Sequence, residues 1–142
     1  MGSCSLRRLT ALWHETIPLS RFMGIEAVAF EEGSLLTRAD TEANKNLHGT
    51  AFAGSLYSLA TLTGWGRVWL ALEEAGLSGD IVLAEGQIHY RRPVRGLPQS
   101  RSLPVQWDLT PLARGEKAVC PVTVAIGEEA RFQGRFVVLP RS

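Results

Sequence analysis

The sequence has few cysteines and almost no excess charge of either sign, and both shortages exclude classes of protein. Two cysteines among 142 residues cannot build a disulfide-stabilised scaffold, and they predict free thiols in a reducing compartment. Fifteen Lys and Arg residues against 14 Asp and Glu leave a net charge of +1, which argues against nucleic-acid binding through overall positive charge. The three histidines are scattered and no cysteine pair lies near them, so we expect no metal site.

The N-terminal residues lack the apolar run of a signal peptide, and Leu6 breaks the myristoylation pattern. We therefore expect a cytoplasmic protein without a lipid anchor. The 142 residues, 45% of them hydrophobic, suffice for one domain with a hydrophobic core. We treat 1–142 as a single domain in which residues 1–17 form an N-terminal helical extension.

One long apolar segment is present at residues 51–72, where Arg67 is the only charged residue. Thr50 is a candidate N-cap for a helix here, and Gly76 is a candidate stop signal. Apolar residues lie on nearly all sides of this helix, which is typical of a membrane span or of a helix enclosed by protein. Its three glycines, several hydroxyl groups and arginine favour the enclosed helix, so we expect no membrane association.

The segments on either side of this helix predict one further helix and a sheet. An amphipathic pattern ends at Pro18, and alternating apolar residues mark strands separated by turn residues. In 81–92 the alternation puts Val82 and Ala84 on the apolar face and Glu85 on the other. Half-apolar strands need a partner layer, so we expect an α+β fold in which a curved antiparallel sheet wraps the central helix. The predicted elements are helices at 6–15 and 51–72, a polar loop at 41–49, and strands at 25–30, 34–40, 81–92, 103–109, 118–126 and 132–138.

Two local motifs resemble those of hot-dog fold thioesterases. The stretch 46–56 (NLHGTAFAGSL) is similar to the segment that opens the central helix in PaaI-like thioesterases, and 88–94 (IHYRRPV) resembles a strand end of that superfamily. Residues 49–66 and 81–93 resemble the YiiD C-terminal-like thioesterase family more closely. The resemblance implies a hot-dog fold, a homodimer or dimer of dimers with sheets paired edge to edge, and acyl-CoA or an acyl carrier protein as substrate. Coenzyme A would enter only as part of the substrate, so no separate cofactor is expected.

Thioester hydrolysis requires a group that stabilises an oxyanion, and the start of the central helix offers candidates. Free backbone N–H groups there carry the positive end of the helix dipole. In the PaaI-like pattern the donor is the N–H of the residue that matches Ala53. Small residues such as Ala53 and Gly54 would let a carbonyl approach, or they are small only for close packing. Asn46 matches the asparagine that orients the carbonyl or a water, or else it stabilises the loop as an Asx-turn residue.

The sequence leaves open which group activates water. Many PaaI-like enzymes carry a carboxylate where this chain has Thr61, and a threonine can only position water or act as a nucleophile that another group activates. Thr61 could equally be a core residue bonded to its own helix. His48 beside the helix start, Glu85 on its strand and His89 are the other candidate bases. His48 and Glu85 could each instead be an ordinary solvent-facing side chain.

Contacts to the rest of the substrate are expected from both motifs. Tyr57 and Thr61 fall on the same side of the helix as its first residues and would line one groove. Arg91 and Arg92 belong to a cationic cluster that could hold CoA phosphates or an acidic carrier, or could only protect a sheet edge. The expected substrate-binding residues are Thr50, Phe52, Tyr57, Arg91 and Arg92.

The leading interpretation is an acyl-CoA or acyl-carrier thioesterase in which water attacks the thioester. A non-catalytic acyl-CoA or acyl-carrier binding protein is the alternative indicated by the missing helix carboxylate. A hot-dog dehydratase or isomerase would need a histidine and a carboxylate facing each other. Dehydratases of this fold carry an acid fourteen residues after the histidine. The residue fourteen positions after His48 is Leu62, which argues against dehydratase activity.

Overall fold

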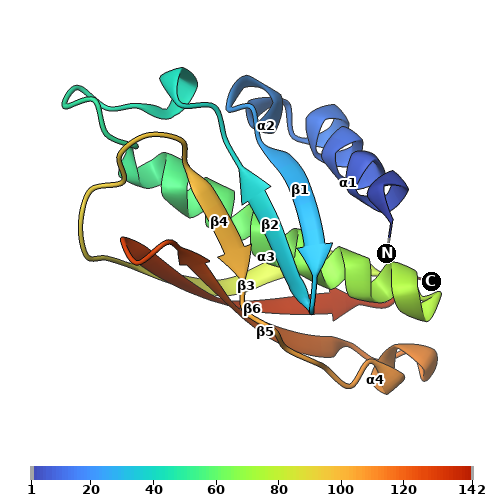
Figure 1. Ribbon diagram of the computed structural model, residues 1–142. Coiled ribbons are helices and arrows are strands. Elements are labelled where there is room, and N and C mark those ends of the chain that lie inside the picture. The colour runs from blue at the N-terminus through green and yellow to red at the C-terminus, as the bar shows by residue number, and fades with distance from the viewer. Residues whose placement is uncertain (1, 142) are drawn as a thin grey trace.

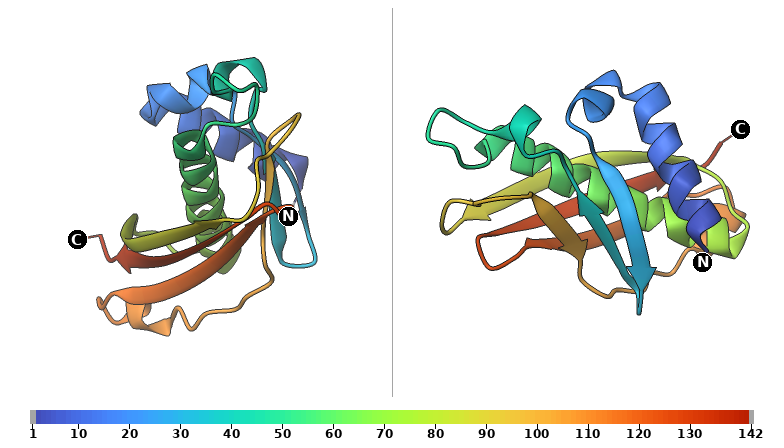
Figure 2. Two further views of the ribbon diagram at one scale, coloured as in Figure 1. Left: turned by 90° about the vertical axis from the view of Figure 1, so that its left-hand side faces the viewer. Right: turned by 45° about the horizontal axis from the view of Figure 1, so that its top comes forward.

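A computed structural model describes residues 2–141 as one curved antiparallel sheet around a long helix (Figure 1). The elements are α1 (Ser3–Thr16), α2 (Pro18–Phe22), β1 (Glu26–Glu31), β2 (Ser34–Arg38), a 3-10 helix (Glu42–Asn44), α3 (Ala53–Ala75), β3 (Asp80–Tyr90), β4 (Gln99–Ser102), α4 (Thr110–Ala113), β5 (Ala118–Ile126) and β6 (Ala130–Leu139). The strand order is β1-β2-β4-β5-β6-β3, which places β1 and β3 at the two edges. Figure 2 shows the sheet curving around α3, with α1 lying outside β1.

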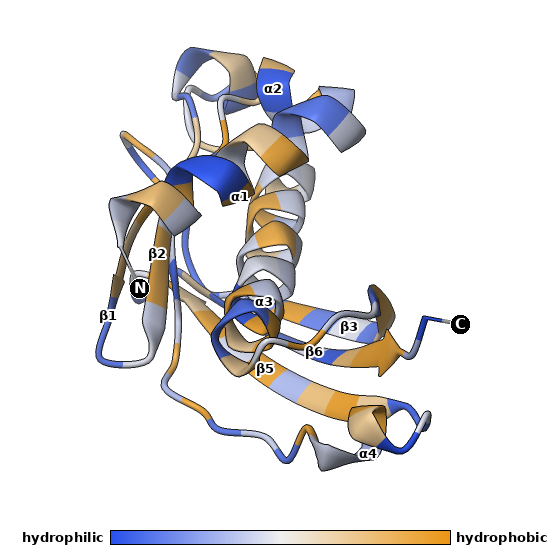
Figure 3. Cartoon of the chain, turned by 90° about the vertical axis from the view of Figure 1, so that its right-hand side faces the viewer, coloured by the Kyte–Doolittle hydropathy of each residue, from blue (hydrophilic) through white to orange (hydrophobic). Residues whose placement is uncertain are grey.

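Helix α3 is enclosed between the sheet and α1, as its all-round apolar pattern predicts. Leu56 and Val68 pack with residues of β5 and β6 into one hydrophobic cluster. Leu59 and Leu70 join Trp13 of α1 in a second cluster. In Figure 3 hydrophobic residues, in orange, recur along α3 and the strands beside it. Within residues 2–141, no helix combines the length and hydropathy needed to cross a bilayer.

Two glycines let α3 approach its neighbours closely. A Cβ on Gly64 would lie 2.6 Å from Phe136 Cε2. A Cβ on Gly66 would lie 2.8 Å from Trp13 Cζ2 and 2.9 Å from Leu35 Cδ2. These distances are shorter than van der Waals contacts allow, so both positions are small because the helix packs directly against large side chains.

A buried group of three hydroxyls joins α3 to the sheet. Thr63 Oγ1 lies 2.7 Å from both Thr37 Oγ1 and Ser100 Oγ, which are themselves 2.9 Å apart. Thr63 also donates to the carbonyl oxygen of Leu59 at 2.7 Å. Because every hydroxyl has a partner, the cost of burying these polar groups is offset by their hydrogen bonds.

Two helix starts differ from the expectation. Helix α3 begins at Ala53 with Phe52 as its N-cap residue, so the prediction that Thr50 caps the helix is wrong. The Thr50 hydroxyl bonds instead to the Asn46 side chain. Pro18 ends the first helical segment but is also the first residue of α2. Proline suits that position because the N–H it lacks would have no partner in the first turn.

The predicted strand at 103–109 is wrong. Strand β4 ends at Ser102, and residues 103–109, here called the strap, form no strand before α4. At the start of the strap, Leu103 N–H still donates to Thr123 O of β5 at 2.9 Å. The side chains of the strap still alternate in exposure as the sequence pattern predicts. Its odd-numbered residues are half-buried and its even-numbered residues are exposed. Pro104 lacks the N–H that a strand ladder needs. After Leu103 the strap is held by side chains such as Trp107, whose Nε1 donates to Pro121 O at 2.9 Å.

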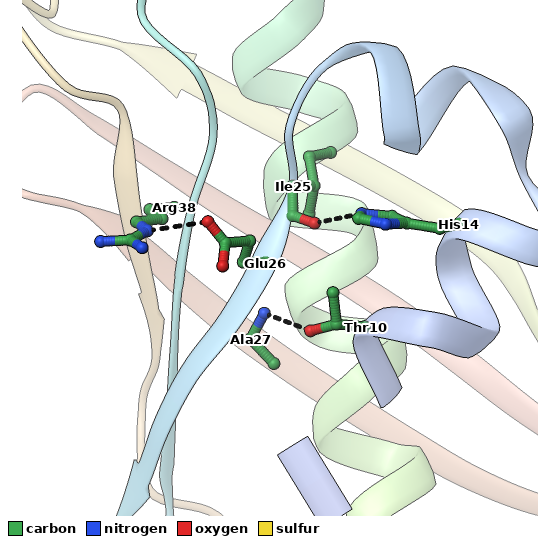
Figure 4. A network of polar contacts seen from close by, with 6 residues as sticks. All are labelled: Thr10, His14, Ile25, Glu26, Ala27 and Arg38. Atoms are coloured by element: carbon green, nitrogen blue, oxygen red, sulfur yellow. Dashed lines mark hydrogen bonds and ion pairs between the residues drawn. The ribbon is translucent and has the colours of Figure 1, made fainter. Parts of the chain in front are cut away.

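The two edges of the sheet are covered differently. At β1, the side chains of Thr10 and His14 of α1 bond to backbone groups at 2.9 and 2.7 Å, which protects this edge (Figure 4). Along β3, Trp65 Nε1 donates to Ile81 O at 3.1 Å, and within residues 2–141 no other hydrogen bond reaches its outer edge. Apart from this contact, the outer edge of the 11-residue strand β3 is available to pair with another strand.

A bulge in β3 changes which residues face α3. The pairing of β3 with β6 shifts register between Leu83 and Glu85. Ile81 and Leu83 therefore pack against the core, whereas Val82 is 40% exposed. The expectation that Val82 and Ala84 lie on the inner face is wrong, because one inserted residue reverses the alternation of side chains.

Candidate active site

The loop before α3 is organised by Asn46. Its Oδ1 accepts hydrogen bonds from the backbone N–H groups of His48 (2.9 Å) and Thr50 (3.1 Å), and its amide donates to Thr50 Oγ1 at 3.0 Å. Gly49 completes the turn with φ 79°, a value that favours glycine. In this structure Asn46 therefore performs the loop-stabilising role, and its expected contact with substrate or water stays a prediction.

The first turn of α3 presents free donors to solvent. Ala53 and Gly54 are exposed, and within residues 2–141 no acceptor is found for the backbone N–H of either residue. The segment before them is fixed, because Ala51 N–H donates to Val94 O at 2.9 Å and Phe52 N–H donates to Asn44 O at 2.7 Å. No side chain caps the helix, so the positive end of its dipole is available to an incoming anion.

Two tyrosines connect this helix start to β3. The Tyr90 hydroxyl donates to the carbonyl oxygen of Ala53 at 2.7 Å, a contact that the sequence did not predict. Partial burial, with a smaller contribution from Tyr57, raises the pKa of Tyr90, which keeps it protonated as a donor. The Tyr57 ring meets Phe132 edge-on at 5.4 Å, and its hydroxyl reaches the backbone of β3 at Gly86.

Thr61 lies beside an apolar cavity of about 300 Å³ between α2, α3 and β3. Its Oγ1 is buried and has no hydrogen-bond partner within residues 2–141. The alternative in which Thr61 bonds back to its own helix is therefore wrong, and Thr63 makes such a bond instead. A buried hydroxyl without a partner leaves hydrogen-bonding capacity unused next to this cavity. The cavity is lined by Ile17, Leu19, Met23, Tyr57, Thr61 and Leu83, among others.

Two of the other candidate bases, His48 and Glu85, do not join this group. His48 is exposed at the tip of the loop, and only its backbone bonds to Asn46. Glu85 is exposed and lines a groove with Pro121 and Arg135 on the outer face of the sheet, away from α3. His48 and Glu85 therefore do not face each other across a site, as dehydration would require. Within the described chain, no three His, Cys, Asp or Glu side chains gather closely enough to hold a metal ion.

Arg91 and Arg92 follow β3 directly and are exposed. Their backbone N–H groups donate to Glu129 O at 2.7 and 3.2 Å, and Arg92 pairs with Glu128 at 3.1 Å. Both arginines line a surface groove of about 480 Å³ with Arg131. Neither Arg91 nor Arg131 has an ion-pair partner among residues 2–141, so the groove carries excess positive charge.

Comparison with known proteins identifies the family of this chain. Residues 6–140 match the model of a family described as "Putative thioesterase (yiiD_Cterm)". The chain belongs to this family. The expected membership of the YiiD C-terminal-like thioesterases is thereby confirmed, and the matched residues include the whole loop, helix and strand that form the candidate site.

Solved structures confirm the α+β hot-dog fold. The crystal structure of the "putative thioesterase from Shewanella oneidensis" is 41% identical to this thioesterase-family chain, with a TM-score of 0.94 over 98% of this chain and 100% of that chain. A protein of unknown function from Chlorobaculum tepidum is 28% identical, with a TM-score of 0.86 over 95% and 94% of the two chains. A thioesterase from Haemophilus influenzae, 20% identical with a TM-score of 0.73 over 95% and 90%, shares the fold.

Proposed function

We propose that the protein hydrolyses acyl thioesters carried on CoA or on an acyl carrier protein, with water as the attacking group. The pair of free backbone N–H groups at Ala53 and Gly54, at the exposed start of a 23-residue helix, carries the proposal. Such donors stabilise the oxyanion that forms when water adds to the thioester carbon. The tetrahedral adduct then expels the thiolate, and the products are a carboxylic acid and a free thiol.

The position of Thr61 supports a site built from residues of two chains. Thr61 lies eight residues after Ala53. At 1.5 Å per residue this is about 12 Å along the helix axis, too far for its hydroxyl to reach a carbonyl oxygen bound at Ala53. Tyr57 lies midway between them, and its hydroxyl contacts Gly86 near the middle of β3. A two-fold axis at this point would pair two β3 strands and set two α3 helices antiparallel, so that Ala53 of one copy faces Thr61 of the other.

The surface around β3 supports a homodimer, which could in turn form a dimer of dimers. The outer edge of β3 is uncovered, whereas α1 blocks the edge at β1. Exposed apolar side chains surround β3 and the start of α3, and a dimer would remove them from water. They are Leu19, Phe22, Phe52, Val82 and Tyr90, which are between 40% and 73% exposed.

In this arrangement the substrate spans three regions. The carbonyl oxygen binds at Ala53, the acyl chain enters the apolar cavity at Thr61, and the carrier extends toward the cationic groove at Arg91 and Arg92. The Thr61 hydroxyl positions the attacking water. Coenzyme A enters as part of the substrate, and the chemistry needs no further cofactor.

The decisive experiment removes one N–H without disturbing the helix. Proline is favoured at the first helical position, and Phe52 already has φ −66° and ψ 133°, a conformation that suits a residue before proline. Ala53→Pro should therefore fold normally and lose about 10²–10³ in kcat, the usual effect of deleting one oxyanion donor. Ala53→Gly, which keeps the N–H, is the matched control. Thiol release from a panel of acyl-CoAs and acyl carriers is the readout, and equal rates for both variants would contradict the proposal.

This chain has Thr61 at the position where many PaaI-like enzymes have a carboxylate. That difference favours a second candidate function, a protein that binds acyl-CoA or acyl carriers without hydrolysing them. The same panel separates the two functions. Saturable binding by calorimetry without any thiol release would identify the binding protein, and Ala53→Pro would then weaken binding rather than turnover.

A further inference from the structure

Arg67 is a buried cation without a carboxylate partner. It is 8% exposed, and within residues 2–141 no Asp or Glu lies within ion-pair distance of it. Its Nε donates to Gly33 O at 3.0 Å and its Nη2 donates to Val105 O at 2.9 Å. The guanidinium carbon lies 5.1 Å from the centre of the Phe30 ring and 4.9 Å from that of Trp107. Buried charges are normally paired with opposite charge, so this arrangement calls for an explanation.

The two carbonyl bonds use only part of the hydrogen-bonding capacity of Arg67. A guanidinium has five N–H donors, and three of these find no acceptor within the described residues. Burial lowers the pKa of Arg67, while the negative charge of Glu74 opposes the shift. The side chain remains a cation at neutral pH, because the ordinary pKa of arginine lies far above that range.

A cavity of about 570 Å³ opens in front of this guanidinium. Its floor is one face of α3, where Ala71 and Ala75 follow Arg67 at intervals of four residues and leave room because they are small. Its walls are the β1–β2 hairpin and the strap, and Glu32 and Glu74 contribute to its lining. Arg67 lies fourteen residues after Ala53. That is about 21 Å along the helix axis, so the cavity is separate from the candidate active site.

We propose that this cavity binds a small organic monocarboxylate with an apolar body, whose carboxylate pairs with the free donors of Arg67. The planar fork of a guanidinium matches a carboxylate in two parallel hydrogen bonds. Alanine methyl groups and the strap side chains Val105 and Leu109 form the apolar surroundings of the ligand body. The carboxylates of Glu32 and Glu74 repel a second negative charge, so phosphates and dicarboxylates are disfavoured. This site does not depend on the proposed thioesterase activity.

The test compares three probes on the full chain by isothermal calorimetry and thermal shift. Benzoate should bind saturably and raise the melting temperature, whereas benzamide, its neutral analogue, and inorganic phosphate should bind at least tenfold more weakly. Arg67→Gln should abolish the difference between benzoate and benzamide. Because loss of Arg67 also releases the strap, Ala71→Phe provides a second variant, which fills the cavity and keeps Arg67 in place.

Benzoate also resembles a product of thioester hydrolysis, so the Ala53→Pro variant identifies which site is occupied. Benzoate binding should be lost in Ala71→Phe and unchanged in Ala53→Pro. The proposal is overturned if benzamide binds as well as benzoate, if binding survives in both cavity variants, or if no probe binds at tens of millimolar. Loss of binding in Ala53→Pro alone would place the ligand in the active site and also overturn the proposal.

Discussion

Thr61→Val and Thr63→Val make the same chemical change two residues apart on α3, and the structure predicts opposite effects on stability. Thr61 Oγ1 is buried without a partner, and burying such a hydroxyl costs about 1–3 kcal/mol. Thr61→Val removes that cost and keeps the shape of the side chain. Thr63→Val instead breaks the contacts of its hydroxyl with Thr37, Ser100 and Leu59. It should cost about 1–2 kcal/mol, because Thr37 and Ser100 still bond to each other.

Thermal unfolding followed by circular dichroism measures both changes. For a chain of this size 1 kcal/mol corresponds to about 3–4 °C, so Tm should rise by at least about 3 °C in Thr61→Val and fall by a similar amount in Thr63→Val. The effects of the two substitutions on kcat should differ from their effects on stability. Loss of a hydrogen bond worth about 0.5–1.5 kcal/mol at the reacting water lowers kcat of Thr61→Val about two- to tenfold. Thr63→Val should keep wild-type kcat below its melting temperature.

Two results would refute this reasoning. A lower Tm for Thr61→Val would show that the hydroxyl has a structural partner in the folded protein. A higher Tm with unchanged kcat would confirm the unpaired hydroxyl and remove Thr61 from the reaction.

Three further predictions concern packing, thiol chemistry and specificity. Gly66→Ala should destabilise the protein by about 1–2 kcal/mol in urea unfolding, because overpacking against Trp13 costs more than the helix gains from alanine, and a raised midpoint would contradict this. Burial raises the pKa of Cys120 to about 11, so iodoacetamide at pH 8 should modify only Cys4 in the folded chain and both thiols in urea, as mass spectrometry can show. Ser58→Phe should fill the cavity beside Thr61 and shift thiol release toward shorter acyl chains, and an unchanged chain-length profile would place the acyl group elsewhere.

The sequence predicted the architecture because the strongest patterns were long ones. The apolar run at 51–72 correctly indicated an enclosed helix, and the alternation at 118–126 and 132–138 matches β5 and β6. Errors occurred where a local backbone feature overrides periodicity. The strap keeps strand-like alternation but forms no strand, and the bulge beside Leu83 reverses the faces of β3. Neither feature has a signal in the spacing of apolar residues.

Only those parts of the candidate site that depend on residues close in sequence could be predicted. The motif at 46–56 located the helix start and the Asn46 turn, because both depend on residues close in sequence. The contact of Tyr90 with Ala53 joins residues far apart in the chain and depends on how the end of β3 packs on α3. The outward direction of Glu85 depends on the register of one strand, so strand assignment alone could not exclude it as a base.

Phe52 occupies the N-cap position of α3, where helices prefer a residue whose side-chain oxygen accepts hydrogen bonds from the N–H groups of the first turn. An Asp or Ser at Phe52 would contribute about 1 kcal/mol to stability, because its oxygen would occupy the vacant amide protons. The same oxygen would compete with any substrate for those protons. The chain therefore lacks this stabilisation and leaves the two amide protons without a side-chain acceptor. A substitution that stabilised this position would place a competing acceptor at the proposed oxyanion site.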